Sequence, residues 1–315
     1  MYVDRARQLS ILAFLLVLSL ALLAYAPSFF QPGNLKDILV NASYLFVAAV
    51  GMMLVILTGQ IDLSVGAILA ICSTAAALAS KAGWPLFAVF LLALGLGGAL
   101  GLLNGLLITT LRIHSIIVTL GTMNIFRGAL IYWTQGAWIY DLPSDFRTVG
   151  LGQFGGIPYP VWGAIVTFAL FAWILTQTSW GRSLYATGSN PSAARLSGIS
   201  TPKIVLGAFI VNGVLVGLSA VLFSTRFSVI QSNIGYGFEL LVITSVVVGG
   251  VHIFGGSGTL LGVALAALLL SMIGTALTFF RVSSYWELTL QGLFVLGAVA
   301  LDIMRTRRSL QRGEV

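Results

Sequence analysis

Long apolar segments, separated by short polar ones, run along almost the whole of this 315-residue chain. A helix needs about 20 apolar residues to cross a bilayer, and a membrane span must satisfy its own backbone hydrogen bonds. The sequence therefore predicts an all-α integral membrane protein with about ten transmembrane helices, forming a single domain over residues 1–315. The candidate spans are 9–26, 38–57, 63–80, 85–110, 115–133, 159–176, 204–225, 238–251, 259–280 and 285–303.

The charged residues predict the orientation of these spans. Only 8% of residues are charged, against about 25% in a soluble domain. The net charge of +7 comes from basic residues at span ends and in short loops, which is typical of topology signals and not of a nucleic-acid-binding face. With the N-terminus in the cytoplasm and an even number of spans, the C-terminus is also cytoplasmic. The basic residues then inside are Arg5, Arg7, Arg112, Arg182, Arg195, Lys203, Arg305, Arg307, Arg308 and Arg312; those outside are Lys36, Lys81, Arg147, Arg226 and Arg281.

The N-terminal segment has two interpretations. Arg5 and Arg7, the apolar run that follows and the sequence Ala24-Tyr25-Ala26 together resemble a secretory signal peptide. Pro27 directly after the expected cleavage site argues against processing. We therefore interpret the segment as an uncleaved first span, and cleavage would leave the remaining topology unchanged.

A polar island, residues 181–202, interrupts the apolar pattern. Asn190 followed by Pro191 is a strong helix start, because Asn accepts hydrogen bonds from free backbone N–H groups and Pro at the first helical position loses none. Gly198 supplies a stop that tolerates the left-handed conformation. A helix of about two turns, unstable alone in water, is therefore predicted on the cytoplasmic side. Such a helix suits a surface on which another protein pushes.

Glycines recur every four residues in the fourth span, at Gly97, Gly101 and Gly105. A ridge of small residues lets a second helix approach closely, which replaces the hydrophobic driving force that lipid cannot supply. The pattern predicts a helix-packing face. Asn104, between two of these positions, is placed to hydrogen-bond across the same interface.

Two glycine-rich segments predict irregular backbone within the membrane region. In residues 58–66, Asp62 is placed as an N-cap for the third span, and the segment is either a simple capped turn or a strained turn that moves during transport. In residues 249–258, irregular backbone survives only if it is buried in protein or lines a wet cavity. The turn residues are Gly59, Asp62, Ser64, Gly66, Gly249, Gly250, Gly255 and Gly256.

Few polar residues lie within the spans, and they are the candidates for a translocation path. Ionisable groups in a span are costly and suggest function by default. Scattered amides with little net charge suit a neutral polyol as the solute. For Arg127, the alternative is that its side chain extends to the outer boundary. The candidates are Asn41, Asn124, Arg127, Asn212 and Glu239.

Chemistry on the chain itself is not indicated. The sequence holds no pair of carboxylates, no Ser/His/Asp set and no metal cluster within the spans, so we expect neither an enzyme nor a metal site. The motif G-x-x-x-x-G-K-[ST] is absent, so the chain does not bind ATP through a P-loop. Its single cysteine, Cys72, lies in an apolar run and excludes an internal disulfide.

Three segments resemble the permease subunits of bacterial ABC importers for monosaccharides. That group serves ribose, arabinose, xylose, galactose and rhamnose, and it includes the autoinducer-2 importers. The segments are 56–66 (ILTGQIDLSVG), 181–190 (GRSLYATGSN) with 193–198 (AARLSG), and 248–250 (VGG) with 255–258 (GGSG). The resemblance covers nearly the whole chain, and WTQGAWIYDLP at 133–143 looks most like the rhamnose and autoinducer-2 members.

The resemblance implies a type II ABC importer permease in the bacterial inner membrane. It implies a second, identical or homologous permease half, two ATPase domains that use ATP and Mg²⁺, and a periplasmic sugar-binding protein. No cofactor is expected on this chain. The residues that match the family's coupling helix are Asn190, Pro191, Ala194, Arg195, Leu196, Ser197 and Gly198.

Three alternatives to this function stay open from the sequence. An ion-coupled secondary transporter usually carries carboxylates or broken helices near the membrane midplane, whereas Asp62, Glu239, Glu287 and Asp302 are expected near span ends. A passive channel for small polar solutes and a non-transporting receptor subunit are the others. The sequence does not identify the sugar.

Overall fold

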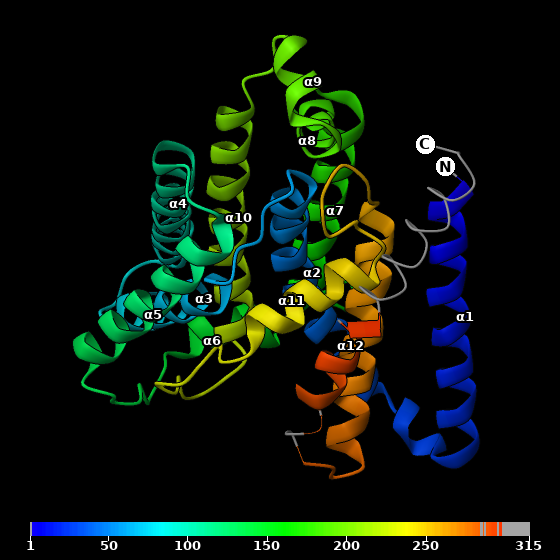
Figure 1. The fold of residues 1–315 in the computed structure, drawn as a ribbon. Coiled ribbons are helices and arrows are strands. Elements are labelled where there is room, and N and C mark those ends of the chain that lie inside the picture. Colours follow the sequence, from blue (N-terminus) through cyan, green and yellow to red (C-terminus); the bar gives the residue numbers. More distant parts are fainter. Residues whose placement is uncertain (1, 284–285, 287, 295, 298–315) are drawn as a thin grey trace.

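The computed structural model describes residues 2–283, 286, 288–294 and 296–297, and the described part is mainly helical (Figure 1). Seven of its helices are long and apolar enough to cross a membrane, and Val65–Lys81 and Phe238–Val248 are shorter apolar helices. The elements are α1 (Tyr2–Tyr25), the 3-10 helix η1 (Pro27–Phe30), α2 (Pro32–Leu57), α3 (Val65–Lys81), α4 (Leu86–Leu111), α5 (Ser115–Thr134), α6 (Ser144–Leu151), β1 (Gln153–Phe154), β2 (Ile157–Pro158), α7 (Tyr159–Gln177), α8 (Ser179–Ser189), α9 (Pro191–Leu196), α10 (Thr201–Ser224), α11 (Phe238–Val248) and α12 (Leu260–Phe279).

Nine of the ten predicted spans coincide with helices, and of the 19 residues of the tenth, 285–303, nine lie outside the described residues. The total of ten is therefore not established. The eighth, α11, has 11 residues and at 1.5 Å per residue extends only about 16 Å, roughly half of the bilayer core. This helix crosses part of the membrane and leaves a loop at each end.

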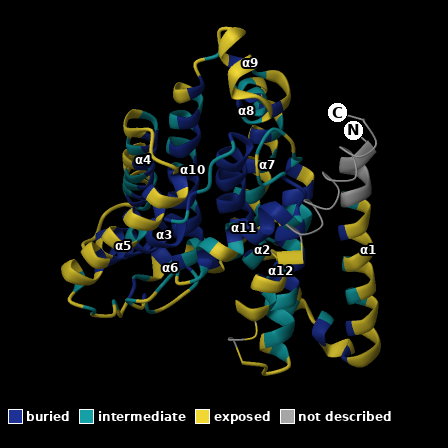
Figure 2. Ribbon diagram, in the orientation of Figure 1, coloured by how far each residue is buried: buried dark blue, intermediate teal, exposed yellow. Residues whose placement is uncertain are grey.

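The centre of the fold is α2, whose second half, residues 45–57, is apolar on all sides. A helix of that kind is stable only when other helices surround it, and 78% of the most apolar stretch of α2 is buried. Figure 2 shows α2 among the other helices, while α1 stands at the edge with an exposed surface. Only 11% of the α1 span is buried.

The glycine ridge of α4 packs against α10. A Cβ atom added at Gly97 would lie 2.1 Å from the Gly213 carbonyl oxygen, and one at Gly101 would lie 2.2 Å from the Phe209 oxygen. At Gly105 the nearest atom is the Leu206 Cδ1 atom, at 2.8 Å. The two backbones approach so closely that a side chain on either ridge forces them apart.

We expect Gly101→Ala to destabilise the fold by about 2 kcal/mol or more, because the added methyl group meets rigid backbone. The matched control is Gly95→Ala in the same helix, where nothing lies within 4 Å of the added Cβ. That change should be neutral or stabilising by up to about 1 kcal/mol, since Ala favours helix over Gly. Thermal unfolding of both variants in detergent measures the difference. Equal melting temperatures would contradict the packing role.

Candidate functional site

The predicted two-turn helix is α9, and it lies beyond the ends of the neighbouring helices (Figure 1). The Asn190 Oδ1 atom accepts hydrogen bonds from the backbone N–H groups of Ser192 (3.1 Å) and Ala193 (3.0 Å). Pro191 is the first helical residue, and Gly198 has φ of +82°. The capping residues therefore set where this helix begins and ends.

The two sides of α9 differ in burial. Ala194 is 3% exposed and holds the helix against the rest of the chain, whereas Leu196 is 92% exposed. Arg195 is also exposed, and its Nη2 atom donates to the Ser192 hydroxyl at 3.2 Å. Figure 2 shows the exposed surface of α9 at the tip of the molecule. The exposed side of α9 thus presents a basic and a large apolar side chain together, outside the bundle.

The base of α9 is joined to the core through α8. A Cβ atom at Gly188 would lie 1.9 Å from the Leu57 carbonyl oxygen at the end of α2. That same oxygen accepts a hydrogen bond from the Gly256 N–H group at 3.0 Å. The Ser189 hydroxyl donates to the Gly256 oxygen (3.3 Å), and the Tyr185 hydroxyl donates to the Gly258 oxygen (3.2 Å). The end of α2 and the 249–258 loop therefore meet α8 at one junction, which the three glycine-containing motifs of the sequence create together.

The 58–64 turn carries a fully buried carboxylate. Asp62 Oδ1 accepts hydrogen bonds from the backbone N–H (2.9 Å) and the hydroxyl (2.6 Å) of Ser64, and Oδ2 accepts one from Asn212 Nδ2 (2.9 Å). Asn104 Nδ2 donates to the Ser64 hydroxyl at 2.8 Å. All four residues have no exposed surface. This network joins α4, α10 and the turn.

Two expectations about Asp62 need correction. The N-cap of α3 is Ser64, and Asp62 lies two residues before this N-cap. Asp62 also does not lie near a span end, because its partner Asn212 is the twelfth of the 24 residues of α10. After α2 the chain turns back into the bundle. The positions of the apolar segments along the sequence therefore do not reveal how deep in the bundle Asp62 lies. Two polar residues isolated in apolar segments were the only signal that could have linked Asp62 to Asn212.

Arg127 and Glu239 lie in a second polar region, at the loop before α11. Arg127 Nη1 donates to the Ile234 oxygen at 2.5 Å, and its guanidinium carbon lies 4.5 Å from the centre of the Tyr236 ring. The residue is 9% exposed, so the side chain folds into the protein instead of extending to a boundary. A Cβ atom at Gly66 would lie 2.1 Å from the Glu239 Oε2 atom. The start of α11 therefore packs closely against the start of α3.

The five path candidates therefore lie in separate places. Asn212 belongs to the buried Asp62 network, whereas Arg127 of α5 and Glu239 of α11 lie near each other, beside the loop before α11. Asn124 is exposed on α5, where its Nδ2 atom donates to the Leu120 oxygen at 2.9 Å. Asn41 lines a cavity.

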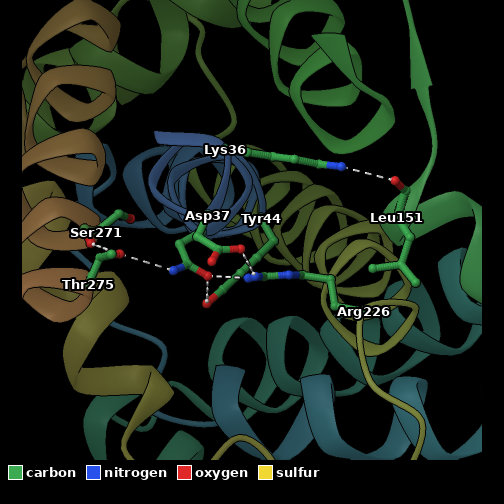
Figure 3. Close-up of polar contacts among 8 residues, drawn as sticks. Lys36, Asp37, Tyr44, Leu151, Arg226, Ser271 and Thr275 are labelled. Atoms are coloured by element: carbon green, nitrogen blue, oxygen red, sulfur yellow. Dashed lines mark hydrogen bonds and ion pairs between the residues drawn. The ribbon is translucent and has the colours of Figure 1, made fainter. Parts of the chain in front are cut away.

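That cavity has a volume of about 400 Å³ and lies at the end of the bundle opposite α9, because it adjoins the C-terminus of α10. Figure 3 shows its polar wall. Arg226 Nη2 is 3.0 Å from Asp37 Oδ1, and Arg226 Nη1 also donates to the Asn41 oxygen. Asn41 Nδ2 donates to the Thr275 hydroxyl at 3.4 Å, and the Tyr44 hydroxyl donates to the Asn41 oxygen at 3.3 Å.

The chemistry of this cavity suits an uncharged solute. The two charged residues that line it, Arg226 and Asp37, form an ion pair with each other. Amide and hydroxyl groups are therefore left to contact a solute. The buried Ser271 hydroxyl lines the same wall and has no hydrogen-bond partner among the described residues. Sequence reasoning missed Arg226 and Asp37 because both were read only as charges near a span end. Among the described residues, no three His, Cys, Asp or Glu side chains form a group that could hold a metal ion.

A bundle of membrane-length helices with a polar cavity at one end and a capped helix beyond the other defines a membrane transport permease. Residues 34–299 match the family described as branched-chain amino acid transport system / permease component, and the chain belongs to this family. The autoinducer 2 import system permease protein LsrC of Enterobacter sp. (strain 638) is 37% identical over 309 residues, 97% of this chain and 89% of that protein. LsrC of Yersinia pseudotuberculosis serotype O:1b (strain IP 31758) is 37% identical over 275 residues, 87% of this chain and 78% of that protein. No solved structure matches the chain.

These similarities confirm the class predicted from the sequence. The chain is a multi-pass membrane permease, the transport component of an ABC importer in the monosaccharide group. Its role is transport and not catalysis, and an importer of this class works with ATPase and substrate-binding partners.

Proposed function

We propose that this chain forms half of the channel of an ATP-driven importer in the bacterial inner membrane, and that its solute is a monosaccharide or the sugar-like autoinducer-2. The observation that carries this proposal is α9, a capped helix outside the bundle whose Leu196 is 92% exposed. A second permease half completes the channel, two ATPase domains on other chains bind ATP and Mg²⁺, and a periplasmic binding protein delivers the solute. This chain holds no cofactor of its own.

The proposed orientation places α9 and both termini in the cytoplasm. The excess of basic residues on that side supports it, and so does the start of α1, which lies at the same end of the bundle as α9 (Figure 1). The polar cavity at Arg226 and Asn41 then faces the periplasm. α10 connects the two ends and, with 24 residues, extends about 36 Å.

The proposed mechanism is alternating access driven from α9. When the ATPases close on ATP, they move α9, and α8 carries the displacement to Leu57 at the end of α2 through the Gly188–Gly256 junction. Because α2 also carries Asn41, the same helix lies at both the coupling junction and the cavity. Movement of α2 therefore alters the solute cavity. The binding protein supplies most of the selectivity, so the cavity needs only weak contacts.

The solute class rests on the cavity and on the relatives. The amide and hydroxyl groups of Asn41, Tyr44 and Thr275 around a neutralised ion pair suit a small neutral molecule with several hydroxyl groups. The two similar proteins named above are permeases of autoinducer-2 import systems. Autoinducer-2 is therefore the first solute to test, and rhamnose and ribose are the next.

The test is reconstitution of the full chain with its ATPase, second permease and binding protein. We expect uptake of radiolabelled solute into proteoliposomes that needs both ATP and the binding protein, and that falls to the level of empty liposomes without either. Uptake driven by a proton or sodium gradient without ATP would instead identify a secondary transporter. Uptake that needs neither energy source would identify a passive channel.

The ion-coupled alternative deserves this direct test because Asp62 lies at mid-depth. Its oxygens accept hydrogen bonds from Ser64 and Asn212, as expected for a carboxylate with a structural role. A protonophore applied while ATP is held constant should leave uptake unchanged.

A further inference from the structure

A second cavity, of about 720 Å³, lies beside α9 at the cytoplasmic end of the bundle. We propose that it receives an acidic side chain of the ATPase subunit, as a second coupling contact next to the α9 helix. This inference rests on the proposed function. The walls come from the end of α4, the start of α10 and α9 itself, and the lining residues are Gln60, Ile108, Thr109, Arg112, Ile113, His114, Arg195, Thr201, Pro202 and Val205.

The charge of the cavity is of one sign. Arg112 and Arg195 line it together with His114, and no Asp or Glu is among the lining residues. Within the described part of the chain, neither arginine forms an ion pair with a carboxylate. A concave surface lined by charges of one sign concentrates its field and favours a partner of the opposite sign. The ligand is therefore anionic.

The backbone holds these groups in place. Arg112 is the C-cap of α4 in the left-handed conformation, with φ of +55°, so the end of a 26-residue helix sets the point from which its side chain leaves the backbone. His114 caps α5, and its Nδ1 atom accepts a hydrogen bond from the Ile116 N–H group at 3.4 Å. The cavity is thus shaped by two helix ends that meet there.

The cavity also reaches the turn that contains Asp62. Gln60 lines it and belongs to the 58–64 segment. The backbone of that segment is held by Ser115, whose hydroxyl accepts from the Ile61 N–H group at 3.1 Å, and by Thr119, whose hydroxyl accepts from the Leu63 N–H group at 3.1 Å. A carboxylate between Arg112 and Gln60 would therefore contact the end of α4 and the turn at once. In this proposal Gln60 is therefore a second contact for the carboxylate.

An ATPase side chain is favoured over a lipid headgroup or a small anion by the position of the cavity. Arg195 belongs to α9, the proposed ATPase contact, so the mouth of the cavity adjoins the surface that the ATPase covers. An acidic residue of the ATPase that lies next to its contact with α9 would enter the cavity during the same association. Lipid and small anions are kept as outcomes of the test.

The test uses Arg112→Glu in the reconstituted importer. We expect the affinity of the permease for its ATPase subunit to fall about tenfold or more, because the change replaces an attraction with a repulsion, and ATP-driven uptake to fall with it. Arg112→Lys should keep most of the affinity. The matched control is Arg182→Glu, the same charge reversal on exposed α8 outside the cavity, and it should change the affinity by less than about threefold.

A crosslinking measurement identifies the occupant. Cys72, the single cysteine, has no exposed surface, so Arg112→Cys can be labelled alone with a photoreactive maleimide. We expect an adduct with the ATPase within a few residues of an Asp or Glu. The proposal would be overturned if the label reached lipid only. It would also be overturned if Arg112→Glu changed only the binding of inorganic phosphate, because the cavity would then be a site for a small anion. Unchanged affinity in Arg112→Glu would likewise overturn the proposal. If wild-type protein shows no ATP-dependent uptake in the same assay, the proposed function fails instead.

Discussion

Leu196→Asp should abolish ATP-driven uptake, with a loss of at least about 100-fold, while the permease stays folded. The side chain is 92% exposed in the isolated chain, so its replacement costs the fold less than about 0.5 kcal/mol. In the proposed importer the same position is buried against the ATPase, where an unpaired carboxylate costs several kcal/mol. Single buried apolar anchors of this kind often account for 2 kcal/mol or more of an interface.

The measurement combines uptake in proteoliposomes, binding of the ATPase subunit and the melting temperature of the permease. The control is Gln177→Asp, which adds the same charge at an exposed position at the end of α7. We expect that variant to transport at close to the wild-type rate. If Leu196→Asp kept both uptake and ATPase binding, α9 would have no coupling role.

The second large effect concerns Asp62, and here the two obvious substitutions should differ. Asp62→Ala removes the acceptor of hydrogen bonds from the Ser64 N–H group, the Ser64 hydroxyl and the Asn212 amide. All of these groups are buried, and each orphaned donor costs about 1–3 kcal/mol. We expect a loss of stability of about 3 kcal/mol or more, together with loss of transport.

Asp62→Asn should be much milder. The replacement keeps one oxygen to accept from Ser64. Its new N–H group can donate to Asn212 Oδ1, which has no hydrogen-bond partner in the described structure, once the Asn212 amide turns over. Thermal unfolding in detergent and uptake at matched protein amounts compare the two variants. Equal damage in both would mean that the negative charge itself is needed, and an ion- or proton-coupled role for Asp62 would return.

The local features of this protein could be predicted from its sequence. Apolar segments of membrane length predicted nine helices close to their observed bounds, because only helices satisfy the backbone in lipid. The Asn190–Pro191 start and the Gly198 stop predicted α9, since capping depends on neighbouring residues only. The four-residue glycine spacing predicted a close helix contact, although not that its partner is α10.

The sites that combine distant segments depended on the tertiary structure. Asp62 and Asn212 are 150 residues apart, and Arg226 and Asp37 are 189 apart. Which residues meet depends on how each helix is rotated about its axis. In a soluble protein the apolar face of a helix indicates that rotation, but lipid is as apolar as the protein core, and helices such as α4 and α10 are apolar on every side. The sequence by itself therefore determined where the helices lie along the chain, and packing between them decided which polar residues share a cavity, a buried network or a junction.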